Sequence, residues 1–127
     1  QRQMCIRDST TDAFEFDDAR TASQVEPLEQ VIDILVERLR AQHIKRLKDG
    51  ACSIDTGVVY LDVLNNVERI SDHCSNIAAR LVGMEAGEDY DSHTLKNMMH
   101  HNPTKEYMLN YEQCRRDYLV PLEQLEA

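Results

Sequence analysis

Glycine and proline, the residues that most often end helices and form turns, are scarce in this chain. Its 127 residues include only four glycines and three prolines, so long stretches run without a break. Apolar residues recur every three or four positions along these stretches, as in amphipathic helices, and no alternating strand pattern occurs. The sequence therefore predicts an all-α domain in which long helices pack as an antiparallel helical bundle.

A first long helix is expected between residues 17 and 48. Asp17 is a suitable N-cap, and Gly50 supplies a stop after a basic last turn. Pro27 interrupts the pattern, so either the helix kinks there or a short helix ends near Val25 and a new one begins at Pro27.

A second long helix should begin after Ser53 as its N-cap and run to about Val82, where Gly83 would end it. The expected core stripe of this helix consists of Val59, Val63, Val67, Ile70, Cys74, Ile77 and Leu81. A short helix over residues 94–100 and a tyrosine-rich last helix, ending near Pro121, complete the predicted bundle.

The opening segment, Gln1 to Asp8, reads QRQMCIRD and looks foreign to the sequence that follows. We therefore interpret residues 1–9 as a foreign or disordered leader and residues 10–127 as one domain. The four cysteines are widely spaced, with no zinc-binding pattern, and no signal-peptide core is present. This favours a reducing, cytosolic compartment.

Charge and motifs exclude several classes of function. The chain carries 14 Lys and Arg against 23 Asp and Glu, a net charge of -9, which repels nucleic acid and anionic lipid. No stretch has the 18 or so uncharged apolar residues that a membrane span requires, so we expect no direct membrane insertion. Motifs for nucleophilic catalysis, phosphate loops and dinucleotide binding are absent, which predicts that the protein is not an enzyme.

Two pairs of carboxylates, Glu29 with Asp33 and Glu68 with Asp72, lie four residues apart on the predicted long helices. Residues at this spacing share one helix face and can coordinate one cation together. The spacing alone carries no information, because a chain this acidic should contain roughly four such pairs by chance. It contains five.

The surroundings of Glu68 and Asp72 are more informative than their spacing. Between residues 51 and 84 only six residues are charged, so this helix looks covered on both faces. Carboxylates in such a place must be paired, protonated or bound to metal, and Arg69 is the obvious partner for a simple ion pair.

Glu29 and Asp33 continue to Glu37 as an acidic line along the first long helix. This line is either a solvated face, with Arg40 offsetting its charge, or one half of a cation site. The second interpretation requires antiparallel packing to bring both carboxylate pairs together.

Residues 68–78 read ERISDHCSNIA, which is similar to the ERIGDHxxNIAE signature of PhoU domains. Ser71 replaces the usual glycine, and Ala79 stands where a final glutamate is common. Residues 25–33, 43–52 and 61–69 resemble the PhoU-like tail of bacterial sodium/phosphate cotransporter family proteins.

The resemblance implies an all-α bundle whose Glu/Asp-x-x-x-Asp motifs hold iron or other metal ions, such as zinc, manganese or magnesium. The positions that match these motifs are Glu29, Asp33, Glu68 and Asp72. It also implies a regulatory role in phosphate homeostasis, at the cytoplasmic face of the cell membrane, with the membrane domain of a sodium-dependent phosphate transporter as partner. The first of the three long helices of a PhoU half is expected to be missing or reduced to residues 10–16.

The alternative is a purely structural or oligomerising helical bundle that makes ion pairs and binds no metal. A missing first helix would expose apolar surface on the remaining helices and favour a homodimer. Among the histidines, His43 lies on the apolar stripe and is expected to be structural, whereas His93, His100 and His101 are expected at the surface.

Overall fold

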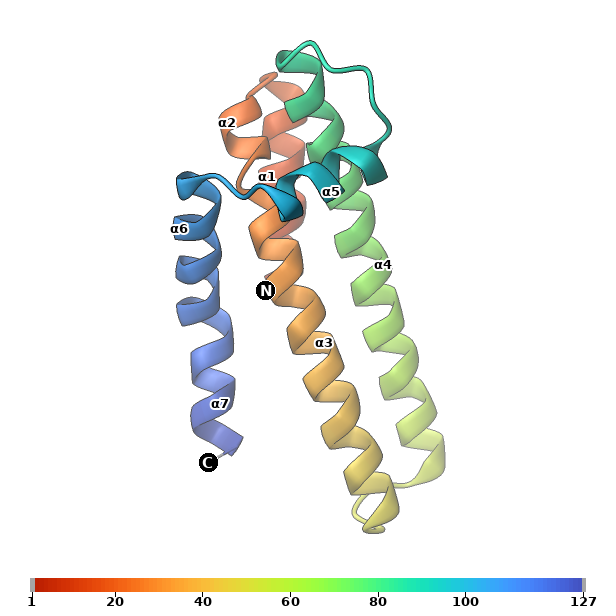
Figure 1. Cartoon of the computed structure of the whole chain (residues 1–127). Coiled ribbons are helices and arrows are strands. Elements are labelled where there is room, and N and C mark those ends of the chain that lie inside the picture. Colours follow the sequence, from red (N-terminus) through yellow and green to blue (C-terminus); the bar gives the residue numbers. More distant parts are fainter. Residues whose placement is uncertain (1, 127) are drawn as a thin grey trace.

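The computed structural model describes residues 2–126, which form helices and short connections with no β-strand among them (Figure 1). The prediction of an all-α bundle is confirmed. In chain order the elements are α1 (Arg2–Glu15), α2 (Ala19–Ala22), α3 (Val25–Lys48), α4 (Ile54–Glu85), α5 (Ser92–His101), α6 (Lys105–Cys114), the π-helical turn η1 (Arg115–Leu119) and α7 (Val120–Glu126). No helix in this described range is both long and apolar enough to cross a membrane.

Helices α3 and α4 form a long antiparallel hairpin at the centre of the molecule (Figure 1). Its turn has the predicted chemistry, because Gly50 adopts a positive φ of 70° and the Ser53 side chain caps α4 by accepting from the amide of Thr56. Helix α1 packs on α4, the α6–η1 segment packs on α3, and α5 crosses against the far end of α4.

The start of α3 resolves the question raised by Pro27. A separate short helix, α2, precedes α3, and Pro27 sits in the first turn of α3, where its missing N–H leaves no helical hydrogen bond unmade. Asp18, rather than Asp17, caps α2 by accepting from the amides of Arg20 and Thr21. Asp17 instead adopts a positive φ of 49° in the turn before it.

The expectations for the amino-terminal segment are corrected by the structure. Residues 2–9 belong to α1, and the Ile6 side chain is fully buried in the main core instead of lying in a disordered leader. The first helix is therefore neither missing nor reduced to residues 10–16, since it covers Arg2–Glu15. Burial of Ile6 and Ala13 on one side of the helix gives this segment a reason to be ordered. Residue 1 lies outside the described residues.

The predicted core stripe of α4 was largely wrong. Val59, Val63, Ile70 and Ile77 are 65%, 54%, 44% and 46% exposed, and only Cys74 of the predicted set is buried. The inward face consists mainly of small residues: Gly57, Leu64, Ser71, Cys74, Ser75, Ala78, Ala79 and Gly83. Small side chains let α1 and α3 approach the α4 backbone closely, so close helix packing selects this face in place of the apolar one.

Gly83 does not end α4, which continues to Glu85. Its function is packing, because a Cβ atom at this position would lie only 2.7 Å from Leu95 Cδ1 of α5. Gly87, with a φ of 73°, follows the helix end instead. The last helical segment likewise continues past Pro121, directly after the π-helical turn η1.

Candidate functional site

An acidic cluster lies where α3, α4 and α5 meet, and we define it as Glu26, Glu29, Asp33, Glu68 and Asp72. The first three share one face of α3, since they are spaced by three and four residues. Glu26 and Glu29 are only 2% and 5% exposed. Carboxylates this deeply buried require hydrogen bonds, protons or cations as partners.

The structure places the four predicted ligands on facing sides of the α3–α4 hairpin. Glu29 and Asp33 raise or lower each other's pKa as direct neighbours, and Asp33 also interacts electrostatically with Glu68 and Asp72. The antiparallel packing on which the cation-site hypothesis depended is therefore present.

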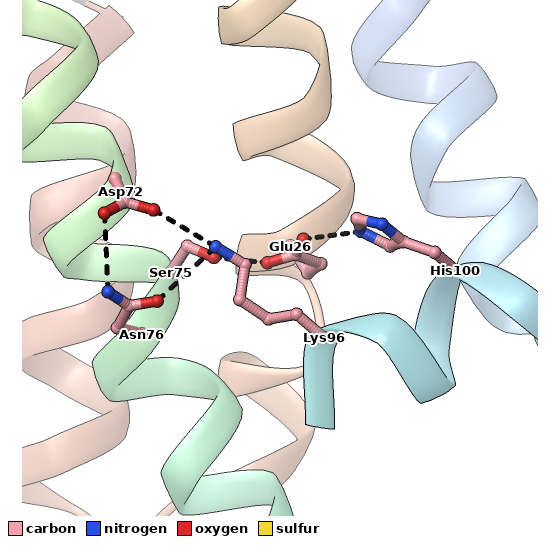
Figure 2. Close-up of polar contacts among 6 residues, drawn as sticks. All are labelled: Glu26, Asp72, Ser75, Asn76, Lys96 and His100. Carbon is pink, nitrogen blue, oxygen red and sulfur yellow. Dashed lines mark hydrogen bonds and ion pairs between the residues drawn. The ribbon is translucent and has the colours of Figure 1, made fainter. Parts of the chain in front are cut away.

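Basic side chains from other helices bind the two carboxylates of α4. Arg40 Nη2 lies 3.0 Å from Glu68 Oε2. Lys96 Nζ lies 3.2 Å from Asp72 Oδ1 (Figure 2). Arg69, the partner suggested by the sequence, is instead exposed. The ion pairs join helices across the bundle, which local sequence spacing could not show.

Glu26 is the most deeply buried member of the acidic cluster. It accepts a hydrogen bond from Ser75 Oγ of α4, and His100 Nε2 of α5 lies 2.7 Å from Glu26 Oε1 (Figure 2). Glu26 thus ties α3 to both neighbouring helices.

Ser71, one turn before Ser75 on the same inward face of α4, is fully buried, and its Oγ has no hydrogen-bond partner. The contacts of Ser75 with Glu26 and of Glu68 with Arg40 bracket it on either side. In an antiparallel pair, Ser71 therefore faces the part of α3 that carries Glu29 and Asp33. A buried polar atom without a partner is uncommon and marks a place where a further ligand would be favourable.

The electrostatics show that negative charge in the cluster exceeds what the nearby cations offset. Burial, with the neighbouring carboxylates of Glu26 and Asp33, raises the pKa of Glu29 to about 8. Burial also raises the pKa of Asp33, and the charges of Glu68 and Asp72 add to that effect. A proton held by Glu29 thus takes the place of a missing positive charge at neutral pH.

Lys96 of α5 interacts with four of the five carboxylates of the cluster. Burial alone would lower the pKa of Lys96, but the charges of Glu26, Glu29 and Asp72 outweigh burial and raise it. Its Nζ also lies 3.4 Å from Asn76 Oδ1. The ammonium group therefore stays charged and acts as the internal cation of the cluster.

A cavity of about 310 Å³ gives access to the cluster from the side of α6. Its lining residues are Glu29, Gln30, Asp33, Ile34, His100 and Tyr111. Among the described residues, no three or more His, Cys, Asp or Glu side chains are arranged to hold a metal ion as the side chains stand. Carboxylate oxygens are nevertheless the donors that hard divalent cations prefer, and Glu29 and Asp33 are reachable from this cavity.

The remaining histidine assignments divide into two kinds. His43 is buried as a structural residue, with its ring 4.5 Å from that of Tyr60 and Nδ1 3.2 Å from Arg46 Nη2. His93 and His101 are exposed, as predicted. His100 is also partly exposed, but its contact with Glu26 makes it part of the site.

Three residues of the site, Glu26, Lys96 and His100, were missed by sequence reasoning. The sequence does contain a signal for Glu26, because residues 26, 29 and 33 fall on one helix face. The predicted acidic line ran from Glu29 toward Glu37 instead, and Glu37 is exposed. Lys96 and His100 lie on a different helix with no local link to the carboxylates, so no sequence pattern identified them.

Residues 6–81 of the chain match the PhoU domain family. The match includes α1 from Ile6 onward, and so includes part of the segment that sequence analysis had set aside, whereas α5 lies beyond it.

Two similar proteins are phosphate-specific transport system accessory protein PhoU homologues. One, from Streptococcus pneumoniae, is 34% identical over 79 residues, covering 62% of this chain and 37% of the relative. The other, PhoU homolog 1 from Thermotoga maritima, is 26% identical over 77 residues, covering 61% of this chain and 33% of the relative. The matched region thus spans about a third of each relative, and no solved structure gives a significant match. Because the family match takes in more than half of its residues, this chain belongs to the PhoU domain family.

Proposed function

We propose that this chain is a regulatory, metal-binding PhoU-like domain of a sodium-dependent phosphate transporter, acting in phosphate homeostasis. The names of its relatives, accessory proteins of a phosphate-specific transport system, support regulation of phosphate transport, not catalysis. The likeness of residues 25–33, 43–52 and 61–69 to cotransporter tails supports the sodium-dependent class. Its partner would then be the membrane domain of that transporter, and its place the cytoplasmic face of the membrane.

The observation that carries the metal-binding part is the uncompensated charge between α3 and α4. Four carboxylates face one another there, and one of them, Glu29, has a pKa of about 8 and so holds a proton at neutral pH. A divalent cation would displace this proton and bring two positive charges to the carboxylates, in place of the one that the proton supplies.

The residues that would hold the cation are Glu29, Asp33, Glu68 and Asp72, with iron, manganese, zinc or magnesium as suitable ions. A bound ion would link α3 to α4 directly and so stiffen the hairpin. Another face of the bundle would remain free to dock on the transporter.

Metal analysis of the purified protein tests this proposal. We expect the wild-type protein to retain Mn²⁺, Zn²⁺ or Fe²⁺ after dialysis, and Glu68→Ala and Asp72→Asn to retain much less. Asp62→Asn is the matched control, because Asp62 is an exposed carboxylate of the same helix, outside the cluster. Equal, near-zero metal in all four samples would refute metal binding.

The alternative, a structural or oligomerising module, is favoured by the exposed apolar row of α4. Val63, Ile70, Ile77 and Met84 are spaced by seven residues and are 44% to 67% exposed. Seven-residue spacing is the signature of helix pairing, and this row extends over about 31 Å at 1.5 Å per residue. It needs a helical partner of similar length.

We propose that this partner is a second copy of the same chain. Asp62 lies beside Val63 at one end of the apolar row, and Arg80 lies between Ile77 and Met84 near the other end. In an antiparallel pair of copies centred near Ile70, Val63 of each copy faces Ile77 of the other and Asp62 lies near Arg80, so these three apolar positions and the two charges are self-complementary.

Light scattering during size-exclusion chromatography measures this association. The wild type is expected to be a dimer, and Ile70→Glu a monomer. Ile54→Glu is the control, because Ile54 is the same residue type and is 79% exposed, against 44% for Ile70, but lies outside the row. A wild type that stays monomeric at high concentration would rule out the second copy.

A further inference from the structure

Helix α5 has two separate attachments to the α3–α4 hairpin. The first is apolar: Leu95 is 3% exposed and fills the space that the absent side chain of Gly83 leaves on α4. The second is electrostatic, and it comes from Lys96 and His100, which lie one helical turn apart on α5. Their nitrogen atoms reach Asp72 and Glu26 respectively (Figure 2).

Lys96 lies in the position that a cation bridging the two helices would have to take. Its ammonium group is 3.2 Å from Asp72 and also acts electrostatically on Glu26, Glu29 and Asp33. It therefore interacts with carboxylates of both α3 and α4, including three of the four proposed ligands. A divalent cation among the same oxygens would meet a like charge a few ångströms away, so the ammonium group and the cation each weaken the binding of the other.

We propose that α5 is a tethered counter-ion: Lys96 competes with a divalent cation for the carboxylates of α3 and α4, and cation binding releases α5 from the hairpin. This inference rests on the proposed metal binding. The inference adds a regulator of metal binding, Lys96, and a conformational consequence of it, the release of α5. The family match ends before α5, so Lys96 and His100 lie outside it, whereas the carboxylates that they contact lie within it.

Release of α5 would also open new surface. A cavity of about 650 Å³ lies beneath α5, and Leu95, Met98 and Met99 form part of its wall together with Tyr107 and Asn110 of α6. Tyr107 Oη and Asn110 Nδ2 are buried there without hydrogen-bond partners. Moving α5 would expose this apolar wall and give both polar atoms access to water.

Calorimetric titration with Mn²⁺ tests the competition. We expect Lys96→Gln to bind Mn²⁺ at least tenfold more tightly than the wild type, because it removes the competing charge while keeping a side chain of similar length. Lys105→Gln is the matched control, since Lys105 is an exposed lysine at the start of α6 and makes the same change in net charge. Lys96→Arg, which keeps the charge, should resemble the wild type.

The outcomes separate the two proposals. If the wild type and Lys96→Gln bind Mn²⁺ with equal affinity, or Lys96→Gln binds less tightly, the tethered counter-ion is wrong while metal binding stands. If neither protein binds Mn²⁺, both proposals fail. If Lys105→Gln tightens binding as much as Lys96→Gln does, the effect is only one of net charge, and the specific role of Lys96 is refuted.

Hydrogen exchange of the wild-type protein tests the release without any substitution. Saturating Mn²⁺ should speed exchange of the α5 amides, residues 92–101, and slow exchange in the neighbouring parts of α3 and α4. Unchanged or slower exchange in α5 when Mn²⁺ is bound would overturn the proposal, even if the Lys96 variants did not fold.

Discussion

The two carboxylate pairs have the same spacing in the sequence but opposite surroundings in the fold. Glu29 is 5% exposed and has a pKa raised to about 8, whereas the side chains of Glu68 and Asp72 are 46% and 52% exposed and bind basic residues. The α3 pair is thus neutralised by a proton and the α4 pair by Arg40 and Lys96. We infer that the α3 carboxylates are the ones whose negative charge still lacks a cationic partner. The negative charges of the α4 carboxylates are already paired with lysine and arginine.

The largest expected effect comes from removing the proton site on α3. The pKa of Glu29 is about 8 in the folded protein, against 4.5 for an ordinary glutamate. Its contribution to stability is therefore fully present below about pH 4.5 and is lost as the pH rises through about 8, with a slope of up to about 1.4 kcal/mol per pH unit. Glu29→Gln cannot ionise, so it should gain stability over the wild type across this window.

Urea unfolding of both proteins between pH 4.5 and 9 measures this difference. The comparable substitution on α4, Glu68→Gln, serves as the control and should show no such gain at high pH. A constant difference in unfolding free energy between Glu29→Gln and the wild type would mean that Glu29 titrates normally, and the contrast between the pairs would disappear.

Metal affinity should depend on pH, because Glu29 must lose its proton to bind a cation. A cation that binds Glu29 must displace its proton, so Mn²⁺ should bind up to tenfold more tightly per pH unit as the pH rises from 6 to 8. Replacing Glu29 with Gln should weaken binding and flatten this dependence. Titrations at pH 6, 7 and 8 give the slope, and a wild-type affinity that does not vary with pH would place the cation away from Glu29.

The buried end of the cluster can be tested through two serines of α4. Ser75→Ala removes a donor to the buried Glu26 carboxylate and should lower the free energy of unfolding by about 1–3 kcal/mol. Ser71→Ala removes a hydroxyl that has no partner, so it should be neutral or slightly stabilising. Thermal unfolding distinguishes them, and equal losses would show that Ser71 has a partner after all.

Local chemistry made some parts of this fold predictable. The Ser53 cap and the Gly50 stop depend on a few neighbouring backbone groups, so the sequence alone identified both ends of the α3–α4 turn. The facing of the two carboxylate pairs was likewise predictable, because an antiparallel hairpin of two long helices leaves few other arrangements.

Parts that depend on tertiary contact were not predictable in this way. In the sequence Gly83 resembles a helix stop, but in the structure Leu95 packs against it. The small residues of α4 likewise resemble a polar face in the sequence, but α1 and α3 pack on them. Ile6 lay in a segment set aside for its composition, yet it is fully buried. Lys96 joins the cluster only through the path of the chain after α4, which no spacing rule encodes.

The smallest expected effect concerns the exposed side of the comparison. Arg40 and Glu68 are only 3.0 Å apart, but both side chains are partly exposed, so water already solvates each charge. We expect Arg40→Met to change the free energy of unfolding by less than about 1 kcal/mol, and a double-mutant cycle with Glu68→Gln to give a similarly small coupling. Arg69→Met, on the exposed face, is the control. A coupling well above 1 kcal/mol would mean that the α4 pair is as well shielded from water as the α3 pair. The contrast between the two pairs would then come from the basic partners of α4 and not from burial.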